Sequence, residues 1–300
     1  MAITKLEQMF DLLKSKDKKR LVAAYANDSH TVDAVSKAID MGIVEGTLVG
    51  NKDVIKKVCR EEGIDEGKFR VVNESDDIKA TAKAIQIIND GGGDILMKGL
   101  VSTDKYMRCI LNKEEGLMDQ GAVLTHITVM ENPNYHKLII IGDVAIIPLP
   151  DIKQKIVITN FLIRTAHALD IRQPKVAILA ASEQMSVSMP ACVDAAILCK
   201  MADRGQIKGG ILDGPLALDL AIDEESCRIK GINSPVAGDA DCILFPNIES
   251  ANTFYKANTK LAGGELGAIV TGARKPCVLS SRGDSVKTKL YSIALAALTA

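Results

Sequence analysis

The sequence predicts an α/β protein built from two domains whose sheets are mostly parallel. Short β-branched runs alternate with helical patterns for most of the chain, which is typical of strands joined by helices that cover both faces of a sheet. The length of 300 residues suits about two domains. With 47% hydrophobic and 25% charged residues, the chain has the balance of a soluble globular protein.

The first hundred residues predict a helix followed by four strands with helices between them. Apolar residues three and four apart mark the opening helix, and β-branched runs mark the strands. Ser29 is a plausible N-cap for the helix after the first strand. In chain order the predicted elements are a helix at 4–16, a strand at 20–26, a helix at 29–41, a strand ending with 47–50, a helix at 52–62, a strand at 69–72, a helix at 76–90 and a strand at 94–99.

From residue 124 to residue 150 the pattern changes, because three apolar runs follow one another with only turns between them. We expect antiparallel strands here, at 126–131, 137–141 and 143–147, near a domain junction. The α/β alternation then resumes with helices at 152–169, 189–203, from 215, at 248–261 and at 285–300, and with strands at 175–179, 209–213, 242–246, 267–270 and 276–280.

The charge balance and the cysteine pattern exclude several classes of protein. A net charge of -1 and 3% aromatic residues with no Trp argue against a main role in binding nucleic acid or an anionic membrane. The charged N-terminal stretch is not a signal peptide, and no apolar run approaches the length of a membrane span. Seven cysteines without a C-x-x-C pair are typical of reduced thiols, so we expect a cytoplasmic protein with no nucleic-acid or membrane partner.

Polar residues gather where the predicted strands end, which is where open α/β sheets bind ligands. Lys98 ends one strand, and Arg108 lies in the helix that follows it. Asp213 ends another strand, while Asn252 and Lys256 belong to the helix at 248–261. These residues predict a cleft for a phosphorylated or otherwise anionic small molecule.

The strongest single signal is the segment SSRGDS, residues 280–285, which precedes the final helix. Its hydroxyls, its backbone amides and the Arg282 guanidinium suit phosphate. The alternative is a capped helix, with Ser285 as N-cap and Arg282 in solvent. The alternative for Lys98 is a solvated side chain, and the alternative for Asp213 is a turn with Pro215 at the first helical position.

Motifs for nucleotide, metal or covalent chemistry are absent from the sequence. It contains no G-x-x-x-x-G-K-[ST], no G-x-G-x-x-G after the first strand and no G-x-S-x-G. The four histidines form no spaced metal pair, and a small buried thiol is the default for a cysteine in an apolar run. The residues therefore predict an enzyme that acts on a phosphate-bearing small molecule in a cleft.

Several blocks in the second two-thirds of the chain resemble the phosphate acetyl/butyryltransferase family, which exchanges coenzyme A for phosphate. The similarity is greatest to the phosphate butyryltransferase branch. The blocks are DILMKGLVST with Arg108, LTH at 124–126, GDVAIIPLPDIKQK from Gly142, SMPACVDAAILCKMADRGQI, DGPLALD from Asp213, GDADCILFPNIESANTFYK from Gly238 and GARKPCVLSSRGDS from Gly272.

The resemblance implies two α/β/α domains related to isocitrate dehydrogenases, with the active site in the cleft between them. It places residues 1–138 and 286–300 in the first domain and residues 139–285 in the second. The implied reaction is acyl-CoA + phosphate ⇌ acyl phosphate + CoA on a short-chain acyl group, butyryl or similar, by direct attack of phosphate on the thioester. No metal and no tightly bound cofactor is implied; coenzyme A is a substrate, and the protein is expected to be a homodimer or larger homo-oligomer.

The resemblance ties Ser281 and Arg282 to catalysis and Arg108 to the anion site. Two departures from the acetyl-specific relatives stand out. Thr288 occupies the position of an Asp proposed to deprotonate the CoA thiol, and Lys260 replaces an Arg. We therefore take Asp284 as the candidate base. The full set expected to bind phosphate or CoA is Lys98, Arg108, Thr125, His126, Asp213, Asn252, Lys256, Lys260, Gly283 and Ser285.

Three alternatives stay open. The enzyme could be a phosphate acetyltransferase, or it could pass acyl groups from acyl carrier protein to phosphate. Thr288 in place of Asp also keeps open a catalytically weak sensor that binds CoA or acyl phosphate. A decarboxylating dehydrogenase would need clustered carboxylates and a nicotinamide site, and the sequence has neither pattern.

Overall fold

The computed structural model describes residues 2–279 and 284–300, which form two compact units. Unit 1 is made of Met1–Leu6 and Thr125–Leu266, and unit 2 of Glu7–Leu124 and Gly267–Ala300. The sequence led us to expect changes of domain near residues 138 and 286, whereas the units change at 124/125 and 266/267. Strand pairing explains the difference: β5 (Thr125–Glu131) pairs with β6 (Ile139–Gly142), and β11 (Cys277–Val278) pairs with β4 (Ile95–Lys98).

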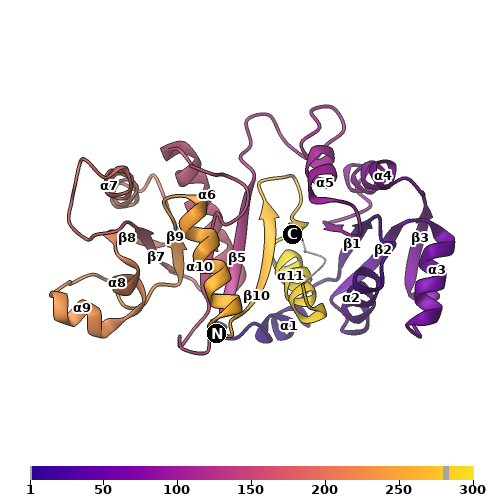
Figure 1. Cartoon of the computed structure of the whole chain (residues 1–300), viewed down its shortest axis with the longest axis horizontal. Helices are drawn as coiled ribbons and strands as arrows, with labels where there is room; N and C mark the ends of the chain where they lie inside the picture. The colour runs from indigo at the N-terminus through magenta and orange to yellow at the C-terminus, as the bar shows by residue number, and fades with distance from the viewer. Residues whose placement is uncertain (1, 280–283) are drawn as a thin grey trace. The chain divides into compact units, whose positions relative to one another are not determined.

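Unit 2 is a sheet with helices on both faces, as predicted. Its strands run in the order β3-β2-β1-β4-β11-β10, all parallel except β10 (Glu265–Thr271), whose last five residues belong to this unit. Helices α1, α2 and α11 pack together, and α4 packs with α5 across the sheet from them (Figure 1). The other elements are β1 (Lys19–Ala24), β2 (Val44–Gly50), β3 (Phe69–Asn73), α1 (Gln8–Leu13), α2 (Ser29–Asp40), α3 (Lys52–Glu61), η1 (Glu66–Lys68), α4 (Asp77–Asn89), α5 (Thr103–Ile110) and α11 (Val286–Thr299).

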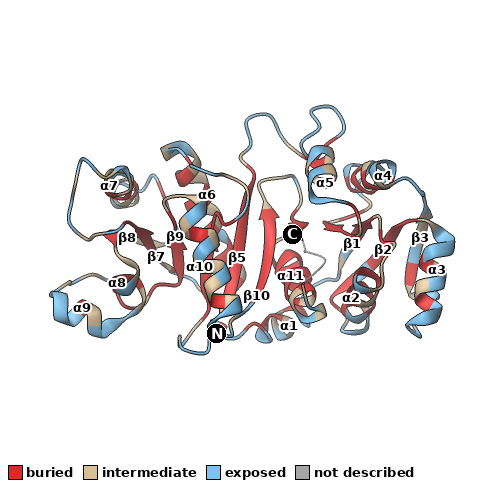
Figure 2. Cartoon of the chain, viewed as in Figure 1, coloured by how far each residue is buried: buried red, intermediate tan, exposed pale blue. Residues whose placement is uncertain are grey.

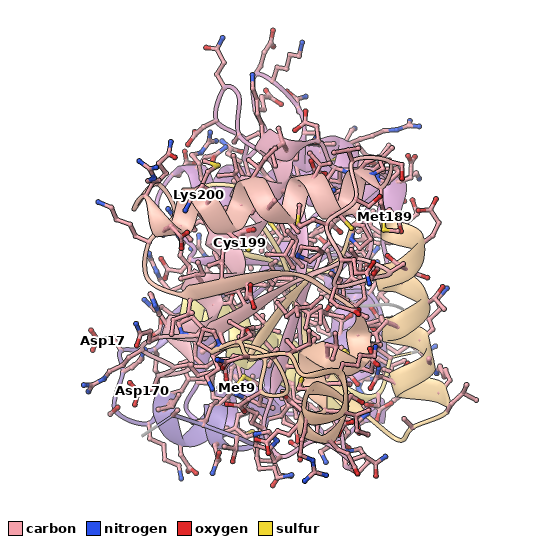
Figure 3. The ribbon with its side chains drawn as sticks, turned by 90° about the vertical axis from the view of Figure 1, so that its left-hand side faces the viewer. Met9, Asp17, Asp170, Met189, Cys199 and Lys200 are labelled. Carbon is pink, nitrogen blue, oxygen red and sulfur yellow. The ribbon has the colours of Figure 1, made fainter. Side chains whose placement is uncertain are left out.

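Unit 1 contains the predicted antiparallel pair and a parallel sheet beside it. Its strands run in the order β5-β6-β9-β7-β8, and β5 with β6 is the antiparallel pair. Helix α7 packs over β8, where the Cys199 thiol lies 3.7 Å from the Gly214 carbonyl; Figure 3 shows Met189 at the start of this helix and Cys199 near its end. The elements are α6 (Ile152–Ala168), β7 (Lys175–Leu179), α7 (Pro190–Asp203), β8 (Ile211–Leu216), α8 (Leu218–Ile222), α9 (Glu224–Lys230), β9 (Cys242–Leu244) and α10 (Ile248–Lys260).

Three local predictions are wrong. The N-cap of α2 is Asp28, whose side chain accepts the Thr31 N–H, whereas the predicted cap, Ser29, is the first residue of the helix. The run DVAII at 143–147 is not a strand, because the Asp143 carboxylate accepts backbone N–H groups of Ala145, Ile146 and Ile147 and so closes a turn. No helix begins at Pro215, which lies inside β8, and the next helix starts at Leu218. Helix α9 was not predicted; Asp223 caps its start and Gly231, in the left-handed region, ends it.

The strands form the cores of both units, and the helices turn one face to solvent (Figure 2). Leu21 to Ala24 of β1 are fully buried, as expected for a parallel strand covered on both faces. Side-chain caps at Asp28, Asn51, Asp76, Ser102 and Ser285 bind the first free amides of their helices. Within residues 2–279 and 284–300, no helix combines the length and apolar character needed to cross a membrane.

Candidate functional site

In unit 2 the carboxyl ends of neighbouring parallel strands meet beside the segment that leads into the last helix. β11 runs parallel to β4, with Val278 opposite Met97, so the chain leaves both strands at the same edge of the sheet. Lys98 ends β4, and Asp284 and Ser285 immediately precede α11. Ser281, Arg282 and Gly283, the centre of the predicted site, lie outside the described residues, so their roles stay predictions.

Lys98 is buried at this edge, with 4% of its surface exposed, so the alternative of a solvated lysine is wrong. Its ammonium donates hydrogen bonds to the carbonyls of Gly99 at 3.1 Å and Val101 at 3.0 Å. The ammonium therefore fixes the turn that follows β4. It also places a positive charge at the strand end, where an anionic ligand would be bound in an open α/β sheet.

Ser285 is the N-cap of α11, as the capped-helix alternative predicted. Its Oγ accepts the backbone N–H of Thr288 at 3.1 Å and lies 3.0 Å from the Thr288 hydroxyl. Thr288, which stands where the acetyl-specific relatives are expected to have an acid, is thus part of the helix cap. The carbonyl of Asp284 accepts a hydrogen bond from Lys289 Nζ at 3.0 Å, and the Asp284 side chain is half-buried.

Lys289 is a buried cation that our sequence analysis missed. It is 2% exposed, and burial lowers the pKa of its ammonium while Asp284 and Asp28 oppose that shift. A signal existed in the sequence, since Lys289 lies among the apolar residues of the last helix rather than on a polar face. Its bond to Asp284 anchors the end of the 280–285 segment to α11.

Arg108 lies on the solvent side of α5. Its side chain is 77% exposed and pairs with Asp104, one helical turn earlier, at 3.1 Å. An exposed pair of this kind is worth only about 0.3–0.5 kcal/mol, so the guanidinium can exchange Asp104 for an anionic ligand at little cost.

In unit 1, Thr125 and His126 are buried at the start of β5 and hydrogen-bonded within the protein. Thr125 Oγ1 donates to Asp143 Oδ2 at 2.9 Å, and His126 Nδ1 lies 3.3 Å from Thr128 Oγ1. Asp143 is another buried polar residue that sequence analysis missed, because the apolar run around it suggested a strand. Its carboxylate connects β5 to the loop that follows β6.

Helix α10 carries three predicted residues at four-residue spacing, which puts them on one side of the helix. Asn252 Nδ2 donates to the Val144 carbonyl at 2.9 Å and holds the helix against the loop after β6. Lys256 and Lys260 are exposed further along the same side. Two cations one turn apart suit an anionic ligand such as a phosphate group.

Asp213 lies inside β8, so the interpretation of this residue as part of a turn was wrong. It is half-buried, and its Oδ1 accepts the Gly214 N–H at 2.8 Å. The structure thus places the described site residues in two sets, one per unit. Unit 2 holds Lys98, Arg108, Asp284 and Ser285, and unit 1 holds Thr125, His126, Asp213, Asn252, Lys256 and Lys260.

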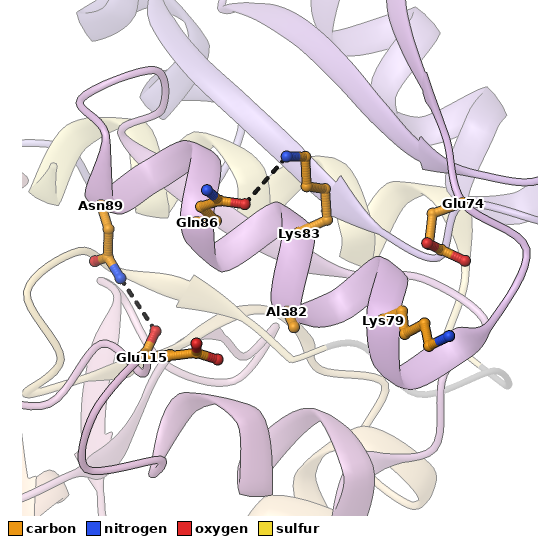
Figure 4. A pocket seen from close by; sticks show the side chains of 7 residues that line it. All are labelled: Glu74, Lys79, Ala82, Lys83, Gln86, Asn89 and Glu115. Atoms are coloured by element: carbon orange, nitrogen blue, oxygen red, sulfur yellow. Dashed lines mark hydrogen bonds between the residues drawn. The ribbon is translucent and has the colours of Figure 1, made fainter.

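A polar groove of about 480 Å³ runs along α4 in unit 2 (Figure 4). Its cations and carboxylates are mixed, and Lys83 Nζ donates to Gln86 at 3.1 Å while Asn89 donates to the Glu115 carbonyl at 3.1 Å. None of the predicted site residues that the structure describes lines it. Among the residues that the structure describes, no group of three or more His, Cys, Asp or Glu side chains could hold a metal ion.

Comparison with known proteins assigns the family. Residues 76–297 match the family described as phosphate acetyl/butaryl transferase. The chain is 44% identical over 288 residues to the phosphate butyryltransferase of Clostridium acetobutylicum, which covers 96% of this chain and 95% of that one. It is 39% identical over 295 residues to the phosphate acetyltransferase of Thermotoga maritima, with 98% and 99% covered.

The fold comparison agrees with the sequence comparison. A branched-chain phosphotransacylase from Enterococcus faecalis V583 superposes with a TM-score of 0.80 at 26% identity, covering 93% of this chain and 99% of that chain. The expected isocitrate dehydrogenase-like α/β fold class is confirmed. The chain therefore belongs to the phosphate acetyl/butyryltransferase family, and it is a phosphate acyltransferase.

Proposed function

We propose that this phosphate acyltransferase catalyses acyl-CoA + phosphate ⇌ acyl phosphate + CoA on butyryl or a similar short or branched acyl group. The observation that carries the proposal is the 44% identity to a phosphate butyryltransferase, which extends over 96% of this chain. The likeness to a branched-chain phosphotransacylase supports a branched or short aliphatic acyl group. From the family resemblance and the thiol pattern we also expect a cytoplasmic homo-oligomer.

The proposed mechanism is a single displacement. A phosphate oxygen attacks the thioester carbonyl carbon, the new C–O bond forms, the C–S bond breaks, and CoA leaves as thiolate, which then takes a proton. Phosphate is already an anion at neutral pH, so bringing two anions together and stabilising the oxyanion should dominate the barrier. Arg282 would hold phosphate through charge-assisted bonds worth about 1.5–3 kcal/mol each, and Ser281 would donate to the oxyanion.

The described residues supply the surroundings of that step. We propose that the buried ammonium of Lys98 contributes positive potential at the end of β4 and that the exposed Arg108 of α5 pairs with an incoming anion. Lys289 would act as a positioning residue, because it holds the backbone of Asp284 beside the predicted phosphate loop. Ser285 holds the start of α11, and Gly283, which lies outside the described residues, stays a predicted residue of that loop.

Asp284 remains our candidate base for the reverse direction. A thiol with an unperturbed pKa of about 8.5 reacts faster when a base or a cation favours the thiolate. Thr288 cannot take this role, since a hydroxyl is not a base at neutral pH and its backbone and side chain complete the Ser285 cap. Among the described residues, half-buried Asp284 is the carboxylate that lies nearest in sequence to Ser281 and Arg282.

In unit 1 we propose that Lys256 and Lys260 bind phosphate groups of CoA. They are exposed and aligned on α10, and Asn252 fixes that helix to the loop after β6. Thr125 and His126 are buried and bonded to Asp143 and Thr128, so we propose that they support the binding site from inside the protein. Asp213 would similarly order β8 around Gly214.

The test follows thiol release from acetyl-, propionyl-, butyryl- and isobutyryl-CoA, with and without phosphate. We expect release that depends on phosphate and is fastest with butyryl- or isobutyryl-CoA. Acetyl-CoA as the best substrate would identify a phosphate acetyltransferase. Release without phosphate would mean a thioesterase, and binding without release would favour the sensor.

A further inference from the structure

Unit 1 contains a pocket of about 670 Å³ at the carboxyl ends of three neighbouring parallel strands. Leu179 and Ala180 line it from the end of β7, Leu218 from the start of α8 after β8, and Phe245 from the end of β9. Phe254 of α10 closes another side. This is the edge of an open α/β sheet at which ligands bind, and the volume lies in the range of small-molecule sites.

The walls of this acyl-side pocket, as we name the cavity, are mainly apolar. The rings of Phe245 and Phe254 lie 5.3 Å apart and tilted by 43°, which fixes the aromatic wall. The polar lining residues Asn247 and Ser250 bond to each other: Asn247 Oδ1 accepts the Ser250 N–H at 3.0 Å and the Ser250 hydroxyl at 2.8 Å. Their bonds serve the start of α10 rather than a ligand.

The charges around the pocket disfavour an anion. None of the described residues that line it is Lys, Arg or His, and the charged lining residue is the carboxylate of Glu249. A phosphate group here would lose water without gaining a cation, which is costly. The pocket therefore suits a neutral, apolar group.

The same helix offers an anion-binding side beyond the pocket. The lining residues of α10 end at Phe254, and the exposed Lys256 and Lys260 follow within the next two turns. A ligand with an apolar end and a phosphate-bearing end matches this division. Acyl-CoA is such a molecule, and its one apolar, variable part is the acyl chain.

We propose that the acyl-side pocket receives the acyl group of the thioester and sets the chain length that the enzyme accepts. This inference rests on the proposed function. The small side chains of Ala180, Ala181 and Thr253 keep the pocket open. Its volume leaves room beyond a butyryl group, so longer and branched chains should also be accepted.

The test fills the pocket from its rim with Thr253→Leu and, separately, Ala181→Leu. Both residues are exposed, so a larger side chain need not disturb the core. Thr259→Leu is the matched control, because Thr259 lies on the same helix and outside the residues given for the lining. The rate constant kcat/KM is measured with acetyl-, butyryl- and hexanoyl-CoA, and the dissociation constants of CoA, butyryl-CoA and hexanoyl-CoA are measured without phosphate.

In both filled variants we expect kcat/KM to fall at least 10-fold for hexanoyl-CoA relative to acetyl-CoA, because one methylene in an apolar pocket is worth about 10–200-fold. The ratio of hexanoyl-CoA affinity to CoA affinity should fall by the same factor as the kcat/KM ratio, while the affinity for CoA itself changes less than about 2-fold. Thr259→Leu should resemble the unmodified protein in both measurements. Equal losses for all chain lengths together with weaker CoA binding would assign the pocket to the body of CoA and overturn the proposal. Unchanged ratios in both variants would also overturn it.

The binding arm separates this proposal from the proposed function. If the protein released no thiol in the presence of phosphate, the transferase reaction would be wrong. The binding preference for longer acyl chains, and its loss on filling the pocket, would still decide what the pocket holds.

Discussion

Replacing Asp143 with Ala should destabilise unit 1 by about 3 kcal/mol. The buried carboxylate accepts hydrogen bonds from Thr125 Oγ1 at 2.9 Å and from the backbone N–H groups of Ala145 at 2.8 Å and Ile146 at 2.9 Å. Thr125 is fully buried, so its unpaired hydroxyl should cost about 1–3 kcal/mol. The amides of Ala145 and Ile146 should add about 1 kcal/mol each, and the longer bond from Ile147 at 3.3 Å adds less. Relief from burying a carboxylate offsets part of the sum.

Urea unfolding followed by circular dichroism measures this change. The control is Asp151→Ala, which removes the exposed cap of α6 and should cost about 1 kcal/mol. The double variant Asp143→Ala with Thr125→Val removes both partners of the buried bond. Because no buried hydroxyl is then left unpaired, it should be about 1–2 kcal/mol more stable than the sum of the two single changes predicts.

Strict additivity of the two changes would refute this reasoning, since it would mean that Thr125 and Asp143 are not coupled. A cost of Asp143→Ala no larger than that of Asp151→Ala would refute the estimate as well. Asn252 provides a functional readout, because it bonds to the carbonyl of Val144 in the same loop. We therefore expect Asp143→Ala also to raise the KM for acyl-CoA.

The other predictions concern charged residues of both units. Arg282→Ala should lower kcat at least about 10²-fold with an unchanged circular dichroism spectrum, and near-normal turnover would remove Arg282 from the mechanism. Lys256→Ala with Lys260→Ala should raise the KM for acyl-CoA and weaken its dependence on salt, whereas an unchanged salt dependence would place the phosphates of CoA elsewhere. The hydrogen bond and charge of Arg20 hold the pKa of Asp94 well below its usual range, despite partial burial. Because the folded pKa of Asp94 is depressed, this stabilisation is present above about pH 4 and is lost as the pH falls further. In Arg20→Met, the free energy of unfolding should therefore fall less between neutral and acid pH. An unchanged dependence of the unfolding free energy on pH would contradict the pairing.

The sequence predicted most elements because their signals are local. Periodic apolar residues, β-branched runs and capping side chains marked the helices and parallel strands, and residues 124–150 were recognised as an antiparallel region. The run at 143–147 misled us, since apolar periodicity does not show that one carboxylate binds the backbone behind it. Pro215 misled us in a related way, because a residue suited to a helix start also fits a strand end.

The candidate site was predictable to a lesser degree. Sequence indicated which polar residues follow the strands, but not whether each is buried, exposed or already bonded. Lys98 and Arg108 were grouped as anion-binding cations, yet one is enclosed at a strand end and the other is exposed on a helix. Lys289 was missed although it lies among apolar residues of the last helix, because its contact with the Asp284 carbonyl belongs to no side-chain motif.

The return of residues 267–300 to unit 2 has a consequence for how the protein is made. β11 borders β4, and α11 packs on α1 and α2, so this unit needs both early and late parts of the chain. Unit 1 is continuous apart from six residues, so it can fold on the ribosome before unit 2 folds. Until β11 has been synthesised, the apolar edge of β4 is open to pairing with a wrong strand. A chaperone that covered this edge would prevent such pairing. Activity can then appear only after residues 267–300 have been synthesised.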